Sequence, residues 1–157
     1  MEIEELNRVL RGKAVNAGLC DEWQTKIWNN NLSVEELLYI YKKGIDFSIK
    51  NRWFSYDLIK EAIPTEELHK ANIYLNEEVD LECSEGGYYV FIGSCNGTLV
   101  IDGMVAATVY VLDNSNVSVK ACGGAKVFVS YYHESSGACL SDGFSTIKKY
   151  LRQEEEG

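Results

Sequence analysis

Apolar residues in the second half of the chain recur at a regular 18-residue spacing, and this spacing constrains the fold more than any other feature. Two interleaved sets share it: Leu81, Leu99 and Val117, and between them Phe91, Val109 and Val127. The sets alternate at steps of 10 and 8 residues, as two short strands per repeat would. Because each repeat of a stacked array buries its apolar face only against its neighbours, the spacing predicts a short β-solenoid.

Five short strands are expected in this half, separated by turn-forming glycine, asparagine and aspartate residues. Period-2 alternation places them at residues 88–92, 98–102, 108–112, 116–120 and 126–130. An antiparallel meander with short loops would produce the same alternation. We favour the solenoid, because hairpin loops have no reason to alternate in length along five strands.

The first half is expected to be helical. Ile3, Leu6 and Leu10 follow a spacing of three to four residues, and Gly18 is a natural stop for that helix. Ser33 and Glu36 form a capping-box pattern that opens the strongest predicted helix, with one apolar face extending to Ile49. Three tryptophans in this half are expected to serve core packing rather than a ligand site: Trp23, Trp28 and Trp53.

The predicted architecture is α+β in three parts. Residues 1–75 form the helical region and residues 76–143 the solenoid of about 18 residues per coil. Residues 144–157 are expected to form a C-terminal capping helix and an acidic tail, since Phe144, Ile147, Tyr150 and Leu151 have helical spacing.

Composition excludes several classes of function. The net charge of −9 repels phosphate backbones, so no nucleic-acid partner is expected. No signal peptide is recognisable at the N-terminus, and no apolar run is long enough to span a membrane. Five cysteines without a C-x-x-C pair favour reduced thiols, so a cytoplasmic protein is expected.

The strand pattern also predicts an apolar outer surface. If Phe91, Val109 and Val127 point inward, their neighbours Ile92, Tyr110 and Phe128 point outward. An 18-residue step stacks these three in one column, whereas the opposite outer face is mostly polar. An apolar outer face must be covered or used. The N-terminal helices can pack on the column, it can be an interface for a second copy or a protein partner, or it can be a platform for an aromatic ligand.

Signals for catalysis are weak. His133 lies near Cys122 and Cys139 in the sequence, but nothing around them orients a nucleophile, and their spacing is not that of a zinc site. Asp102-Gly103 and Asp142-Gly143 read as turns. We therefore predict no catalytic residues, no metal site and no cofactor.

Two stretches carry a resemblance. Residues 10–24, LRGKAVNAGLCDEWQ, and residues 44–50, GIDFSIK, resemble an uncharacterised family of small bacterial proteins associated with mobile elements and prophages. The layout is similar too, with a helical front followed by repeats such as ATVYV and AKVFV. The resemblance implies a solenoid and a bacterial cytoplasm, and it implies no activity or site residues.

Three functions remain open at this point. The first is a non-enzymatic interaction or assembly module, motivated by the apolar outer column. The second is a small carbohydrate-binding or carbohydrate-active solenoid protein, which predicts that glycans raise the melting temperature. The third is an acidic decoy for a DNA-processing enzyme, which predicts capture that weakens with salt.

Overall fold

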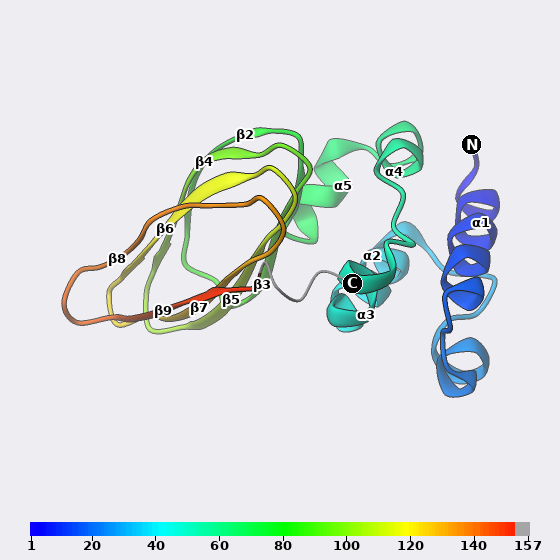
Figure 1. The fold of residues 1–157 in the computed structure, drawn as a ribbon, viewed down its shortest axis with the longest axis horizontal. Helices are drawn as coiled ribbons and strands as arrows, with labels where there is room; N and C mark the ends of the chain where they lie inside the picture. The colour runs from blue at the N-terminus through cyan, green and yellow to red at the C-terminus, as the bar shows by residue number, and fades with distance from the viewer. Residues whose placement is uncertain (153–157) are drawn as a thin grey trace. The chain divides into compact units, whose positions relative to one another are not determined.

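The structure, a computed structural model, describes residues 1–152 and divides into two compact units. The first unit runs from Met1 to Ala71 and is helical, and the second begins at Asn72 and is built from strands (Figure 1). The sheet thus begins before the predicted boundary at residue 75. The predicted acidic tail, residues 154–156, lies outside the described residues.

The helical unit contains five α-helices and one π-helical turn among its described residues. They are α1 (Ile3–Asn16), the π turn η1 (Trp23–Ile27), α2 (Val34–Lys43), α3 (Ile45–Asn51), α4 (Tyr56–Ala62) and α5 (Thr65–Lys70). The capping box is confirmed: the Glu36 amide donates to Ser33 Oγ over 3.2 Å, and the Ser33 amide donates to Glu36 Oε1 over 3.1 Å. The helix expected to reach Ile49 instead breaks at Gly44 into α2 and α3.

Aromatic side chains form the centre of the helical unit. Tyr41 and Phe54 stack with ring centroids 3.9 Å apart, and Trp53 packs edge-on against both rings. The ring centroids of Trp28 and Trp53 lie 4.7 Å apart, and both side chains are buried. Two of the three tryptophans therefore pack in the core, as predicted. Such contacts add to the stabilisation from buried apolar area.

The second unit is a β-solenoid. Its strands are β1 (Ile73–Leu75), β2 (Glu78–Cys83), β3 (Gly87–Ile92), β4 (Asn96–Asp102), β5 (Ala106–Val111), β6 (Asn116–Cys122), β7 (Lys126–Tyr131), β8 (Cys139–Ser141) and β9 (Thr146–Leu151). Odd-numbered strands form sheet A, even-numbered strands form sheet B, and all pairs are parallel. Successive coils contribute one strand to each sheet (Figure 1). The solenoid is confirmed, and the antiparallel meander is excluded.

The coil is about 20 residues long rather than 18. Only the step from β2 to β4 is 18, pairing Leu81 with Leu99; the next step pairs Leu99 with Val119. Both steps are even numbers, so inward positions keep the same parity along sheet B. In sheet A the first step, from β1 to β3, is 17 and pairs the inward Tyr74 with the inward Phe91. The interior therefore matches the expectation, and it contains residues from both predicted sets, such as Phe91, Leu99 and Val127.

The predicted capping helix is wrong. Residues 146–151 form β9, which pairs in parallel with β7 along its whole length. The free edge of β7 offers backbone donors and acceptors that a strand satisfies and a helix would not.

An inward-pointing lysine ends the solenoid core instead. Lys149 pairs with Val129, whose side chain belongs to the interior, and its ammonium lies 5.2 Å from the centre of the Tyr131 ring. The same ammonium donates to the Gly137 carbonyl over 2.7 Å. A charge placed inward on the last strand blunts further strand addition at this end.

We expect the last coil to weaken in acid through Asp142. The Gly123 amide donates to its carboxylate over 2.8 Å, as do the amides of Phe144 and Ser145, and these bonds lower the Asp142 pKa from 3.8 to about 2. A lowered folded-state pKa stabilises above pH 3.8, and this contribution is lost as the pH falls from 3.8 towards 2. The protection of residues 139–151 against hydrogen exchange, relative to the intrinsic rate at each pH, should fall over that interval.

The control for this prediction is Asp142→Asn. The amide keeps one acceptor oxygen and has no charge, so protection should already be lower at pH 7 and should change less between pH 4 and pH 2. Equal acid sensitivity in both proteins would contradict a role for the Asp142 carboxylate.

Candidate functional site

The outer side of sheet A carries aromatic side chains, and we call Tyr88, Tyr110, Phe128 and Tyr150 the aromatic face. Alternation with the inward residues of β3, β5, β7 and β9 places all four outward. Tyr88 and Tyr150 are exposed, whereas Tyr110 and Phe128 are half-buried. The aromatic surface predicted for one side of the solenoid is therefore present, with different neighbours.

The tyrosine rings contact one another diagonally across the strands. Tyr88 meets Tyr110 edge-on with ring centroids 5.7 Å apart, and Tyr110 stacks on Tyr132 at 6.5 Å. In each pair, the second tyrosine is on the adjacent strand, two residues beyond the position that is paired with the first. These are diagonal neighbours in a sheet, and aromatic side chains are long enough to make contact at that distance. The contacts fix the orientation of the half-buried Tyr110.

The predicted column does not form as such. Tyr110 pairs with Val90 on one side and Ser130 on the other, so Ile92, Tyr110 and Phe128 lie on a diagonal of the same face. The cause is the 20-residue coil, which shifts each strand by two residues from the assumed register. Ile92 is fully buried, and the role of all three residues in an interface stays a prediction.

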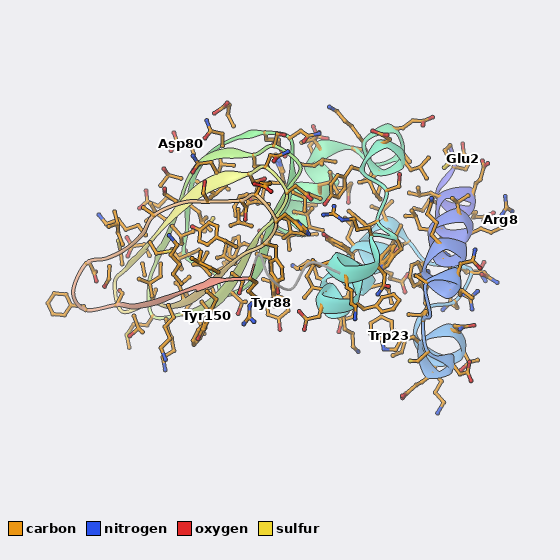
Figure 2. All side chains as sticks on the ribbon, viewed as in Figure 1. Glu2, Arg8, Trp23, Asp80, Tyr88 and Tyr150 are labelled. Carbon is orange, nitrogen blue, oxygen red and sulfur yellow. The ribbon has the colours of Figure 1, made fainter. Side chains whose placement is uncertain are left out.

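The two outer sides of the solenoid differ in charge. The outward positions of sheet A include the exposed Lys126 and Lys148 and no aspartate or glutamate within the described strands. Sheet B carries outward Glu78, Asp80 and Glu82 on β2 and is mostly polar, with one outward lysine. Figure 2 shows Asp80 and Tyr150 on opposite sides of the solenoid. We call the outward positions of β2 and β4 the acidic face; its charged residues are Glu78, Asp80, Glu82 and Asp102.

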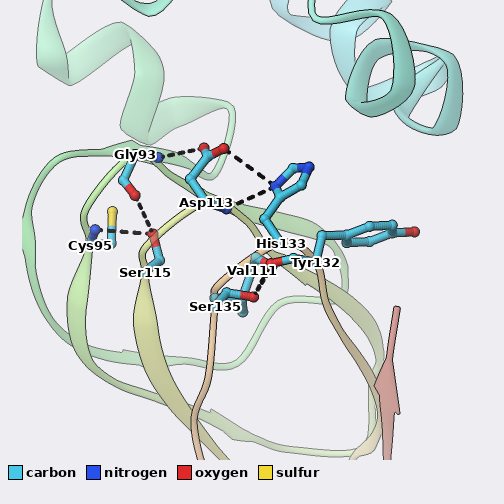
Figure 3. A network of polar contacts seen from close by, with 8 residues as sticks. All are labelled: Gly93, Cys95, Val111, Asp113, Ser115, Tyr132, His133 and Ser135. Atoms are coloured by element: carbon cyan, nitrogen blue, oxygen red, sulfur yellow. Dashed lines mark hydrogen bonds and ion pairs between the residues drawn. The ribbon is translucent and has the colours of Figure 1, made fainter. Parts of the chain in front are cut away.

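Polar side chains at one corner of the solenoid brace successive coils (Figure 3). Asp113 Oδ2 accepts from the Gly93 amide over 2.9 Å, and the Asp113 amide donates to His133 Nδ1 over 3.1 Å. Two residues after Asp113, Ser115 Oγ accepts a hydrogen bond from the Cys95 amide over 3.1 Å. Each side chain bonds to the backbone of the preceding coil, so this network joins coils.

His133 is therefore placed by the corner and not by the cysteines near it in sequence. Its Nδ1 lies 3.4 Å from Asp113 Oδ1, and its ring is buried. The same nitrogen therefore faces both the backbone amide and the carboxylate of Asp113. These contacts fix the ring of His133 at the corner.

The cysteines near His133 have other neighbours. Cys139 Sγ lies 3.7 Å from the Tyr131 hydroxyl, and burial raises the pKa of its thiol. Burial also raises the pKa of the Cys95 thiol, and a protonated buried thiol is a poor nucleophile. Within residues 1–152, no three histidine, cysteine, aspartate or glutamate side chains are grouped so as to hold a metal ion.

The helices of the described part offer no membrane segment: none has the length and apolar composition needed to cross a bilayer. We also compared the chain with protein-family models, curated proteins and solved structures, and nothing matched. The aromatic face and the acidic face are thus the surface features that distinguish the solenoid.

Proposed function

We propose that the protein is a non-enzymatic assembly module in which the aromatic face of one copy packs on the acidic face of another. The observation that carries the proposal is the opposite character of the two faces: tyrosines, a phenylalanine and lysines on sheet A, and aspartates and glutamates on β2 and β4 of sheet B. Complementary charge favours this pairing over one between two like faces.

Such an interface joins two different surfaces of the same chain. Heterologous contacts of this kind extend into rows unless the rotation between copies closes them into a ring. In the proposed contact, the aromatic rings bury apolar area. The lysines beside Phe128 pair with carboxylates of the acidic face and so set the relative orientation of the two copies. Tyrosine and phenylalanine are enriched in the cores of protein interfaces.

The compartment and origin belong to the same proposal. We place the module in a reducing cytoplasm, because all five cysteines are unpaired: Cys20, Cys83, Cys95, Cys122 and Cys139. The N-terminal resemblance adds a bacterial mobile element or prophage as the expected source.

The test is molar mass by light scattering after size exclusion, over a range of protein concentrations. The molar mass of the wild type should rise above that of one chain as the protein concentration increases. Tyr110→Asp places a carboxylate among the rings and should give a folded monomer, because a like charge then faces the acidic side of its partner. Tyr88→Asp, at a position that is 41% exposed, repeats the test where folding is least at risk.

The matched control makes the same substitution at a tyrosine that belongs to neither face. Tyr39→Asp lies on α2, where the side chain is 61% exposed, and should leave association intact. A wild type that stays monomeric at every concentration would refute the proposal. So would folded Tyr110→Asp and Tyr88→Asp variants that associate like the wild type.

A further inference from the structure

The helical unit contains a pocket of about 310 Å³. The proposed association between copies does not involve this pocket. Aromatic and aliphatic side chains form most of its wall: Leu19, Trp23, Trp28, Ile40, Phe47 and Trp53. Gly18 and Cys20 also line it, and both are exposed, so the pocket opens to solvent there. No charged side chain is among the described residues that line it.

One wall of the pocket is held in place by hydrogen bonds from α1. Arg11 Nε donates to the Trp28 carbonyl over 2.9 Å, and Arg11 Nη2 donates to the Gln24 carbonyl over 2.7 Å. Gln24 Nε2 in turn donates to the Leu19 carbonyl over 2.6 Å. The π turn η1 is thus tied to the helix before it and to the loop at the mouth of the pocket. Figure 2 labels Trp23, which η1 carries.

The opposite wall depends on the break between α2 and α3. A Cβ atom on Gly44 would lie 3.1 Å from the Trp23 ring, so glycine allows the indole to approach the backbone at this break. Trp53 and Ile40 close the wall from the aromatic core. Single π turns within helical segments are frequent at functional sites, and η1 borders this pocket.

The polar groups of Trp28, Trp53 and Ser48 in the walls have hydrogen-bond partners within the protein. The Trp28 indole donates to Asn7 Oδ1 over 2.7 Å, and the Trp53 indole donates to Ser48 Oγ over 2.9 Å. Ser48 Oγ itself donates to the Gly44 carbonyl over 2.8 Å. What these indoles present to the pocket is therefore ring carbon. Such a surface binds apolar and aromatic groups and disfavours a charged one, which would lose its hydration without a partner.

From this geometry we propose that the pocket binds a small uncharged aromatic molecule of two or three fused rings. An apolar protein cavity of roughly 150 Å³ holds a single benzene ring, so about twice that volume corresponds to a larger ring system. The walls are fixed before binding, which reduces the entropy lost when a ligand is bound.

The test uses 2-naphthol as the probe, titrated into the full-length protein by calorimetry. We expect one saturable site with micromolar affinity, and at least about tenfold weaker binding of 2-naphthalenesulfonate, because a buried sulfonate has no cationic partner there. Cys20→Trp fills the mouth and should weaken 2-naphthol binding at least about tenfold. Thr25→Trp adds the same ring at an exposed position of η1 that does not line the pocket, so it is the matched control and should bind like the wild type.

A second readout does not depend on heat. Iodoacetamide alkylation of the exposed Cys20 should slow when 2-naphthol is present, whereas alkylation of the half-buried Cys83 should not change. Circular dichroism confirms folding of each variant, and Phe47→Trp replaces Cys20→Trp if the latter fails to fold. No saturation, equal affinity for the sulfonate, or unchanged binding in a folded filled variant would each overturn the proposal.

Discussion

Gly97→Ala is expected to destabilise the solenoid by about 3 kcal/mol or more. Gly97 has φ = +147°, and a Cβ atom there would lie 1.8 Å from the Val79 carbonyl oxygen of the preceding coil. Val79 and Gly97 are paired in the register of β2 and β4, so neither can move without breaking the ladder. The strained backbone and the clash act in the same direction.

The measurement is thermal unfolding followed at a strand-sensitive wavelength, together with hydrogen exchange of residues 78–102. A loss of this size should lower the transition of a unit as small as the solenoid by roughly 12–24 °C. Gly137→Ala tests the same position two coils later, where a Cβ would lie 2.0 Å from the Val117 carbonyl. Its effect should be confined more closely to the last coil.

Gly12→Ala is the contrasting control for this prediction. It lies within α1, nothing approaches its Cβ position within 4 Å, and alanine favours the helix by about 0.5–1 kcal/mol. This substitution should slightly stabilise the helical unit and leave the strands unchanged. A Gly97→Ala protein that unfolds like the wild type would show that the Val79 carbonyl yields.

The alternation of apolar residues predicted the inner and outer positions but not the coil length. Leu99 is apolar, and so are Val117 and Val119, because any even shift along a strand matches apolar with apolar. The interior therefore tolerates an error of two residues in the register. The predicted column of Ile92, Tyr110 and Phe128 does not tolerate this error, because the residues that lie side by side on neighbouring strands depend on the exact number of residues per coil.

The corners of the solenoid contained the missing signal. Gly103, Gly123 and Gly143 recur at 20 residues, and Asp113 and His133 have the same step. All of them adopt positive φ, a conformation that turns require and strands do not, so corner residues report the coil length without the ambiguity of alternation. The strand β9 was not predicted either. The apolar spacing of its segment indicated a helix, and spacing along the chain does not show that the segment can pair with the free edge of β7.

The tryptophan pocket could not be predicted from spacing. Its wall combines residues from a loop, a π turn and two helices between Gly18 and Trp53, and the helix break at Gly44 is what brings Trp23 against the backbone. The expectation of core packing holds for Trp28 and Trp53, which are buried. Trp23 is half-buried and lines the pocket.

If the aromatic face of one copy packs on the acidic face of another, exchanging their charges should abolish and then restore association. Lys126→Glu with Lys148→Glu makes the aromatic face acidic, so that it repels the unchanged acidic face. Asp80→Lys with Glu82→Lys leaves two carboxylates and two lysines on the acidic face, so that it no longer attracts the unchanged aromatic face. Each double variant alone should therefore be monomeric by light scattering.

An equimolar mixture of the two double variants should associate again. In the mixture, each altered face meets the opposite altered face and each native face meets its native counterpart, so both contacts regain complementary charge. Wild-type association should weaken between 0.1 M and 1 M salt, as the screening length falls from roughly 10 Å to 3 Å. All four positions are exposed, so the substitutions should leave the solenoid folded.

The decisive control separates local complementarity from total charge. Lys13→Glu with Lys60→Glu changes the net charge by the same amount as the lysine exchange on β7 and β9, but it does so on exposed positions of α1 and α4. That variant should associate almost as well as the wild type. If it is instead monomeric, net repulsion between acidic chains explains the loss. If the mixture of complementary variants stays monomeric, the two faces do not meet, and a different protein must be sought for the aromatic face.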